Sequence, residues 1–292
     1  DTTSRGSHVP TSLPIKTLVI LVGNLRCGEL AWESFYRNFL DYNNHNNNSS
    51  NSNNQTSRFP HQLDLALAIG DPTTSMYPNA SLLSRAKFVF SFPEYGDDWS
   101  DALNMIDPDW KERIAPLLAN TSILLGGIPY RGWHGSGAIS FWIRWFLVQQ
   151  LVQHNLVTRY DRFVITRTDH FYMCPHDLST LDPQYLWLPH GQDFGGIIDR
   201  HWIVQSPHVL AALDILPALF QNPSDYPMIS DNWYNPEQLI LDRWKQEGLV
   251  RLVKRFPRMM FTCGNPILDD STRWKHTSEV VEEGVRKKYR KE

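Results

Sequence analysis

Short apolar runs alternate with amphipathic stretches along most of the chain. Residues 17–22 form a continuous apolar run, typical of a strand covered on both faces, and Gly23 and Asn24 end it before an amphipathic stretch. Other runs that stop at turn residues predict further strands in "LDLALAIGD", "AKFVFSF", residues 161–168, "QYLWLP", "GGIIDRHWIVQS" and "VRLVKRFPRMMFT".

Helical spacing appears between these runs. Apolar positions from Ile139 to Leu156 predict the longest helix, and shorter helices are expected near 99–106, 109–118, 208–220 and 236–247. Alternating strands and helices predict an α/β fold. We expect a single Rossmann-like domain with a mostly parallel central sheet flanked by helices.

The domain is expected to span residues 15–275, because no internal linker resembles a boundary. Residues 1–14 are expected to be a flexible N-terminal segment. Residues 43–57 are polar and of low complexity, so they cannot bury enough apolar surface to stay ordered and predict a disordered insertion. Residues 276–292 predict a basic helical tail, with two Glu-to-basic pairs at i,i+4 spacing.

Charge and hydropathy exclude two classes of partner. The chain has 28 Lys and Arg against 31 Asp and Glu, so no general basic field attracts a nucleic-acid backbone. A membrane-spanning helix needs roughly 20 apolar residues. The best candidate, "ISFWIRWFLVQQLV", carries Arg144 and two glutamines. We therefore expect no nucleic-acid partner and no membrane segment within this sequence.

Cysteines and glycosylation acceptors bear on the compartment. Cys27, Cys174 and Cys263 permit at most one internal disulfide, so the chain is not a disulfide scaffold. Acceptor triplets of the form N-x-[ST] begin at Asn47, Asn48, Asn54, Asn79 and Asn120. They favour the lumen of the secretory pathway, with the Golgi as the expected compartment. Chance occurrence in the asparagine-rich segment is the alternative.

Three expected strands end in small or polar residues. In open α/β sheets, ligands gather beyond the carboxyl ends of the strands. A Gly-Asn turn lets backbone N–H groups approach a ligand, and the helix that follows adds the positive end of its dipole. The residues at these strand ends are Gly23, Asn24 and Arg26, then Gly70 and Asp71, then Arg167 and Asp169.

The third strand end, "VITRTDHFY", carries an arginine and a carboxylate. Side chains alternate along a strand, so Arg167 and Asp169 are expected on one face and Thr168 and His170 on the other. One interpretation is an i,i+2 ion pair that caps the strand. The other is a ligand site, in which the Asp169 carboxylate holds Mn²⁺ or Mg²⁺ bridging a diphosphate.

The segment "PHGQDFGGIIDRHW" is a second cluster of charge. Its two adjacent glycines suggest either close backbone approach to a ligand or a bulge. Asp199, Arg200 and His201 interrupt an otherwise apolar strand, and such charges must be paired or solvated, which favours a cleft. Asp193 or Asp199 would then take a proton from an acceptor hydroxyl, and Arg200 or His201 would balance charge on a leaving phosphate.

Weaker signals lie at two helix starts. "GWHGSG" either places His134 near an anion or forms a plain N-cap, and Glu237 is expected to cap its helix, with the site as the alternative. His170 and His176 lack a zinc-ligand pattern. The sequence has no Walker loop, G-x-S-x-G elbow or G-x-G-x-x-G fingerprint, which argues against P-loop kinases, Ser-His-Asp hydrolases and dinucleotide-dependent oxidoreductases.

Three segments carry a resemblance to a known family: "VGNLR" after the first strand, "YDRFVITRTD" after the longest helix, and "DFGGIIDRHWIV" before a later helix. Together they resemble the nucleotide-sugar glycosyltransferases of the GT-A fold, in particular eukaryotic members with an Arg-x-Asp strand end. The resemblance spans roughly residues 15–262. It implies that the nucleotide binds at Val22, Gly23, Asn24 and Arg26, with Asp71 and Arg167 nearby.

The family's metal motif is only half present. An Asp-x-Asp motif normally ligates manganese or magnesium on the diphosphate, whereas the matching place here reads Arg167-Thr168-Asp169. Only Asp169 fits a ligand position, and Arg167 could partly replace the charge of the cation.

We therefore expect a transferase that moves a sugar from a nucleoside-diphosphate donor to a hydroxyl of a glycan or glycoprotein. One alternative is a carbohydrate-binding protein without catalysis that uses some of the eleven tryptophans, although these are more often core residues. The other is a metal-dependent hydrolase, which requires Asp169, His170, His176 and Asp199 to converge on one or two ions.

Overall fold

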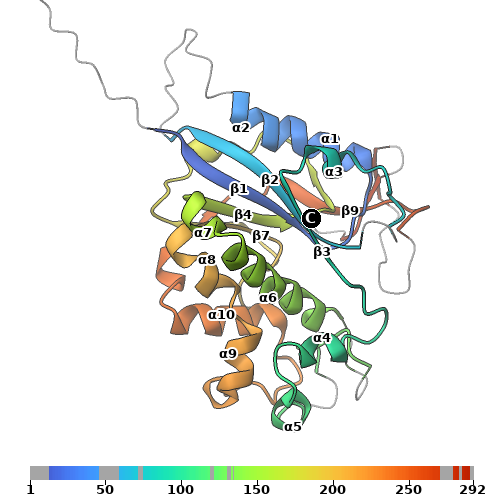
Figure 1. The fold of residues 1–292 in the computed structure, drawn as a ribbon, viewed down its shortest axis with the longest axis vertical. Coiled ribbons are helices and arrows are strands. Elements are labelled where there is room, and N and C mark those ends of the chain that lie inside the picture. The colour runs from blue at the N-terminus through green and yellow to red at the C-terminus, as the bar shows by residue number, and fades with distance from the viewer. Residues whose placement is uncertain are drawn as a thin grey trace, which may run out of the picture.

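A computed structural model describes residues 13–45, 59–71, 75–118, 122–129, 133, 135–269, 279–282 and 285–289. Figure 1 shows a central sheet with helices on both faces. The expected α/β class, with a mostly parallel central sheet in a Rossmann-like arrangement, is confirmed.

The central sheet has seven strands in the order β3-β2-β1-β4-β7-β6-β8. Strands β1, β2, β3 and β4 are mutually parallel, and β7 runs against both β4 and β6. The strands are β1 (Ile15–Val22), β2 (His61–Gly70), β3 (Phe88–Phe92), β4 (Arg162–Arg167), β6 (Leu186–Pro189), β7 (His201–Gln205) and β8 (Val253–Phe256).

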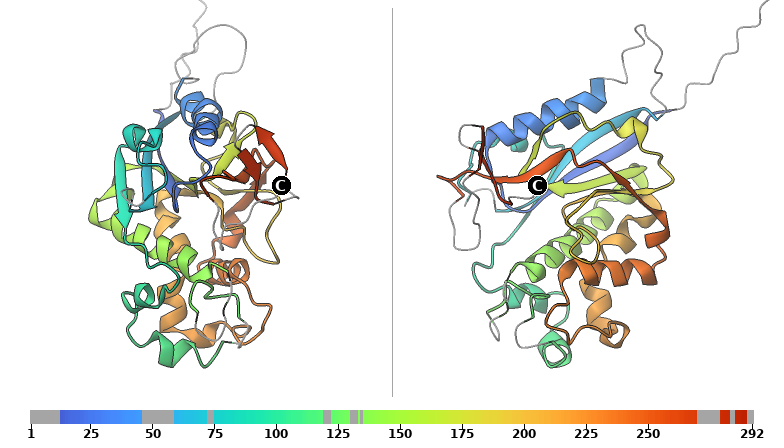
Figure 2. Two further views of the ribbon diagram at one scale, coloured as in Figure 1. Left: turned by 90° about the vertical axis from the view of Figure 1, so that its right-hand side faces the viewer. Right: turned by 180° about the vertical axis from the view of Figure 1, so that it is seen from behind.

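One face of the sheet is covered by a continuous rod made of α1 (Glu29–Phe35), a π-helical turn (Tyr36–Leu40) and α2 (Asp41–His45), with α3 (Ser81–Arg85) beside it (Figure 1). The remaining helices lie on the other side of the sheet around the longest helix, as the views of Figure 2 also show. These are α4 (Ser100–Asn104), α5 (Trp110–Ile114), α6 (Gly137–Gln153), α7 (Leu156–Arg159), α8 (Ser206–Leu213), α9 (Leu216–Gln221) and α10 (Pro236–Gln246). Of these, α5 and α9 lie farthest from the sheet.

The continuous apolar strands feed two cores because successive side chains point to opposite faces. Leu18 and Ile20 of β1 lie in the core beneath α6, whereas Val19 and Leu21 lie in the core beneath α1. This double burial explains why β1 reads as an unbroken apolar run rather than an alternating one.

A second, smaller sheet adjoins the carboxyl end of β4. Its order is β10-β11-β9-β5, formed by Val280–Glu282, Val285–Lys287, Met260–Gly264 and His170–Tyr172. A disulfide joins Cys27, in the loop after β1, to Cys263 of β9. Cys174 is a free, exposed thiol. Short 3-10 helices lie at Leu178–Thr180, Pro223–Asp225 and Val250–Leu252.

The expected helical tail is wrong where it can be checked. Residues 280–282 and 285–287 form antiparallel strands instead of a helix. The β-branched Val280 and the buried Val285 suit a strand, and β9 offers backbone groups for pairing that outweigh the i,i+4 charge pairs. Residues 1–12 of the expected flexible segment lie outside the described residues.

The disordered insertion predicted for 43–57 is wrong at residues 43–45. Helix α2 continues to His45, and Asn43 is buried in it. The Asn43 amide donates to the backbone oxygens of Phe39 and His176 and accepts from the backbone of Leu178, so this residue fastens α2 to a distant loop. Residues 46–57 of the prediction lie outside the described part.

Two other expected elements differ in extent. The helix expected at 208–220 is two helices, α8 and α9, because Pro217 lies in the first turn of α9 and cannot continue a preceding helix. Strand β7 begins at His201, so Asp199 and Arg200 precede the strand rather than interrupt it. In the described residues, no helix has both the length and the apolar character to cross a membrane.

Candidate functional site

The order of the strands creates a switch point between β1 and β4. From β1 the chain proceeds outward through β2 and β3, and then returns to add β4 on the other side of β1. Ligands of open α/β sheets bind beyond the carboxyl ends of the strands at such a point. Val22 and Arg167 are register partners at these two ends, so the first and third candidate strand ends meet there.

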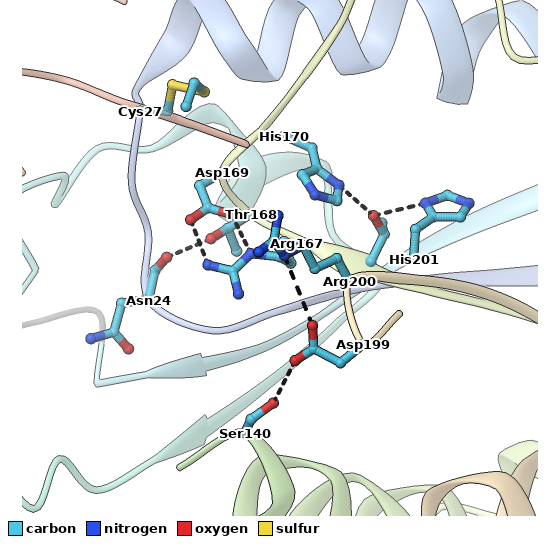
Figure 3. Close-up of polar contacts among 12 residues, drawn as sticks. Asn24, Cys27, Ser140, Arg167, Thr168, Asp169, His170, Asp199, Arg200 and His201 are labelled. Carbon is cyan, nitrogen blue, oxygen red and sulfur yellow. Dashed lines mark hydrogen bonds and ion pairs between the residues drawn. A yellow bond between two sulfur atoms is a disulfide. The ribbon is translucent and has the colours of Figure 1, made fainter. Parts of the chain in front are cut away.

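The ends of β1, β2 and β3 converge beside Arg167. Gly23 has a φ of 96°, which permits the sharp turn, and its N–H donates to Ala68 of β2. A Cβ on Gly70 would collide with the Glu94 carboxylate and the Asn24 side chain. The Thr168 hydroxyl donates to the Asn24 carbonyl, which ties the β1 loop to the end of β4 (Figure 3).

Arg167 and Asp169 form the bidentate pair that one interpretation of the sequence describes. Arg167 Nε donates to Asp169 Oδ1 at 2.7 Å, and Nη2 donates to Oδ2 at 2.8 Å. The Arg167 side chain is 29% exposed and that of Asp169 only 2%. Arg167 is therefore the more accessible member of the pair, and the Asp169 carboxylate is shielded from solvent.

Electrostatics keeps both members of the pair charged. Burial works against ionisation of Asp169, but Arg167 outweighs it and holds the pKa of the carboxyl below its ordinary range. Burial likewise disfavours the Arg167 cation, and Asp169 more than offsets this by raising the pKa of Arg167. Removing either partner would leave an uncompensated buried charge.

A second charged group, Asp199 and Arg200, directly precedes β7. His201, the first residue of β7, is the register partner of Thr166, so this group lies beside the end of β4. Ser140 Oγ donates to Asp199 Oδ2 at 3.1 Å, and Arg200 Nε lies 3.9 Å from Asp199 Oδ1. Arg144 of α6 is almost fully buried and donates to the Asp199 carbonyl. Figure 3 shows Asp169 paired with Arg167, and Asp199 and Ser140 toward α6.

Asp199 and Glu237 have opposite electrostatic environments. Although burial opposes it, Arg144 and then Arg200 lower the pKa of Asp199. Burial first, and then the Asp199 charge, raise the pKa of Glu237 to about 7. Two neighbouring carboxyls with pKa values pushed apart form the pattern that separates acid–base roles in enzymes.

Gly196 brings Glu237 close to Asp199. A Cβ on Gly196 would collide with the Glu237 carbonyl oxygen, and the Ile197 N–H donates to that same oxygen at 2.9 Å. The glycine therefore allows a close backbone approach. The sequence suggests a ligand as the partner of such an approach, whereas the structure has the backbone of helix α10 there. A capping box between Asn235 and Gln238 starts that helix, so Glu237 does not serve as its N-cap.

Neutral histidines lie behind the charged group. The Thr166 hydroxyl lies 3.0 Å from His170 Nδ1 and 2.9 Å from His201 Nδ1. Burial lowers the pKa of His170 to about 3, and burial followed by His176 lowers the pKa of His201. A cavity of about 10 Å³, enough for roughly one water molecule, is lined by His170, His201, Arg200 and Arg258 among others. These rings add no charge at neutral pH.

Two further basic side chains interact with Asp169 from other segments. Arg26 follows β1; burial lowers its pKa, the carboxylates Asp169, Asp269 and Glu94 oppose this, and Arg167 acts with burial. Lys288 directly follows β11, and its charge interacts with Arg167, Asp169 and Arg26. The Tyr289 ring lies against Arg200, with 4.3 Å from the guanidinium carbon to the ring centroid.

The donor set does not fit the divalent cation that the family resemblance implies. Both Asp169 oxygens accept hydrogen bonds from Arg167, and the neighbouring side chains Arg26 and Lys288 are basic and cannot ligate a cation when protonated. Within the described residues, no three or more His, Cys, Asp or Glu side chains form a group that could hold a metal ion. The hydrolase alternative requires Asp169, His170, His176 and Asp199 to form such a group. In the described residues they do not, so the structure gives this alternative no support.

Most of the expected site residues come together at this edge of the sheet. They are Val22, Gly23, Asn24, Arg26, Arg167, Asp169, Asp199 and Arg200. Asp71 follows β2 and is exposed. Asp193 is engaged elsewhere, because Arg255 Nη1 lies 2.9 Å from its Oδ1 and the Ile198 N–H donates to the same oxygen. His134 lies outside the described residues.

Sequence reasoning misses two contributors, Lys288 and Arg144, and ranks the site only second for Glu237. The tail pattern predicts a helix at Lys288, and Arg144 is identified only as a charge in an apolar stretch. The Arg144 signal was available, because a charge inside the longest apolar helix must find a partner. Lys288 offered none, since its place depends on long-range pairing of the C-terminal strands.

Comparisons with known proteins do not assign the chain to a family. No protein-family model matches the chain, and a search of curated proteins finds no match.

Proposed function

We propose that this protein is a glycosyltransferase that moves a sugar from a nucleoside-diphosphate donor to a hydroxyl of a glycan or glycoprotein acceptor. The observation that carries the proposal is the switch point between β1 and β4, where Val22 and Arg167 are register partners and several cations gather. A diphosphate matches such a site in both charge and location.

The cations supply stabilisation where charge develops. As the bond between the anomeric carbon and the diphosphate breaks, its electron pair moves to the phosphate oxygen. The charges of Arg167 and Arg200 both act on Asp199 and on Lys288, and their partners Asp169 and Asp199 hold them in place (Figure 3). Donors that are already oriented stabilise the leaving group without reorganisation.

Glu237 is the best-suited general base. The acceptor oxygen forms a bond to the anomeric carbon and loses its proton, which the Glu237 carboxylate takes. A base works best when its pKa lies near the working pH, and the pKa of Glu237 is raised to about 7. Asp199 is held ionised by arginines and is therefore a weaker base. The role expected for Asp193 or Asp199 passes to Glu237 in this proposal.

Exposed aromatic side chains near Glu237 support a glycan acceptor. Trp233 is 83% exposed and Phe194 is 56% exposed. The Asn235 side chain donates to the Phe194 carbonyl at 2.9 Å, which links the two segments beside the start of α10. Phe194 adopts a φ of 45°, a costly conformation for an aromatic residue and one that clusters at functional sites. Sugar rings pack against such faces.

The disulfide supports the secretory pathway as the compartment. Structural disulfides persist in oxidising compartments, and the Cys27–Cys263 bond joins two segments of the candidate site. Asn79, one of the possible glycosylation acceptors, is exposed. Golgi residence remains part of the proposal on this basis.

The transferase is tested by release of nucleoside diphosphate from a panel of nucleotide sugars, with a mixture of glycan acceptors. Glu237→Gln is expected to lower the rate by about 10²- to 10⁴-fold, the usual contribution of a general base. Glu247→Gln is the matched control, because Glu247 pairs with Arg243 at the far end of α10. No turnover of any donor, or equal rates in both variants, would contradict the proposal.

The carbohydrate-binding alternative remains as an outcome of testing. Seven tryptophans of the described residues are buried in the core and cannot contact a sugar: Trp32, Trp99, Trp110, Trp133, Trp142, Trp202 and Trp244. A protein that binds oligosaccharides through Trp233 and Phe194 but turns over no donor would fit that alternative.

A further inference from the structure

We propose that the diphosphate is bound by the protein's own cations, with Lys288 of the C-terminal strand segment completing the set, so that donor binding needs no divalent metal. The inference rests on the proposed function for the identity of the ligand. It rests on the geometry of the second sheet for the role of Lys288.

The first argument is the position of the metal-motif carboxylate. Asp169 is 2% exposed, and both of its oxygens accept from Arg167. A metal at this carboxylate would have to displace the guanidinium and enter a region that also contains the basic side chains Arg26 and Lys288. Arginine matches phosphate with a planar set of donors, and the Arg167 side chain is 29% exposed, so Arg167 can take the place of the ion.

The second argument is how the chain brings Lys288 to this point. Lys287 is the register partner of Cys263 in β9, and the Lys288 N–H donates to the Thr262 carbonyl at 2.9 Å. Thr262 is in turn the register partner of His170, the residue after Asp169. Two strand spacings make about 10 Å, which long lysine and arginine side chains can span.

The third argument is covalent. Cys27 directly follows Arg26, and its disulfide partner Cys263 lies opposite Lys287. One bond therefore holds the backbones of both added cations at the same edge of the sheet. The Cys27 N–H also donates to Asp269 Oδ2 at 2.7 Å, which fixes the loop that presents Arg26.

The surroundings of Lys288 indicate that an anion would relieve repulsion there. Burial, and then the positive charge of Arg167, lower the pKa of Lys288 to about 6, with Arg26 and Arg200 acting in the same direction. Asp169 opposes this shift. Lys288 is therefore largely uncharged at neutral pH without a ligand, and an anion bound beside it would raise its pKa, so that binding is coupled to uptake of a proton by Lys288.

Calorimetric titration of the full chain with inorganic pyrophosphate, in metal-free buffer with EDTA, tests the inference. The wild-type protein is expected to bind, and Lys288→Met to bind at least about tenfold more weakly, the effect of losing one charge-assisted contact. Lys287→Met is the matched control, because Lys287 pairs with Glu279 at 2.8 Å. It is expected to stay within about twofold of wild type. Arg26→Met should behave as Lys288→Met does.

The outcomes separate this inference from the proposed function. If pyrophosphate binds only after manganese is added, or if Lys288→Met equals Lys287→Met while both variants keep the wild-type unfolding midpoint, the inference is overturned. Sugar transfer that requires manganese would overturn it too, while leaving the transferase intact. Lys288-dependent binding in EDTA without turnover of any nucleotide sugar would support an anion site here and contradict the transferase.

Discussion

Replacing Glu237 with glutamine is expected to stabilise the protein above neutral pH. Burial and the neighbouring Asp199 charge raise the pKa of Glu237 from 4.5 to about 7 in the folded chain. Between these values the folded state keeps a proton that the unfolded state has released. The free energy of unfolding therefore falls as pH rises from about 4.5 to about 7, and it levels off above that.

The size of this effect follows from the shift. Each pKa unit corresponds to about 1.4 kcal/mol, so a shift of about 2.5 units gives an upper value of about 3 kcal/mol. Glu237 is partly exposed, which reduces the expected cost to about 2 kcal/mol. Glutamine has the shape of the protonated acid but cannot ionise. The variant should match wild type near pH 4.5 and exceed it by about 2 kcal/mol at pH 8, or roughly 4 °C in the midpoint.

The assay is thermal or urea unfolding of both proteins from pH 4.5 to pH 9. Glu247→Gln serves again as the control, because Glu247 is exposed at the C-terminal end of α10, where it pairs with Arg243. Its difference from wild type should not follow a titration near pH 7. A Glu237→Gln variant that is less stable than wild type at pH 8, or a difference that does not change with pH, would refute the placement of Glu237 among buried charges.

Three more predictions concern the same region. In urea unfolding, Arg167→Met should lower the free energy of unfolding by about 3–5 kcal/mol, because the buried Asp169 loses its partner. Adding Asp169→Asn to the same chain should restore part of that lost stability; no restoration would contradict the pairing. Replacing Cys27 and Cys263 with alanine should cost about 2–5 kcal/mol and weaken pyrophosphate binding; unchanged affinity would show that the disulfide does not position the cations. Trp233→Ala should raise the acceptor KM without changing donor binding, and an equal loss of donor binding would contradict an acceptor role.

The fold could be predicted from the sequence for strands that are buried on both faces and for helices whose apolar residues recur at helical spacing. Strand β1 and helix α6 carry dense local signals, because their apolar positions follow from which faces they bury. The strand ends followed from turn residues such as Gly23. The break between α8 and α9 also had a local cause in Pro217, although the apolar pattern runs through it.

The site could be predicted only in part. The meeting of Val22 with Arg167 follows from a general rule about strand ends, so those residues were found. Lys288 reaches the site through pairing of the terminal strands with β9, and Glu237 through the close approach at Gly196. Both contacts join segments far apart in sequence. The two adjacent glycines indicate a close approach but not its partner, and the residues around Lys288 give no signal.

Thermal unfolding of the wild-type chain with a panel of nucleoside diphosphates tests the central claim most directly. A ligand at about 100 times its dissociation constant adds about 2.7 kcal/mol, which is roughly 5 °C for a domain of this size. We predict that one nucleoside diphosphate raises the midpoint by this amount in EDTA, whereas the matching nucleoside does not. If free oligosaccharides raise the midpoint and no nucleoside diphosphate does, with or without manganese, the claim that the β1–β4 switch point binds a nucleotide-sugar donor is contradicted.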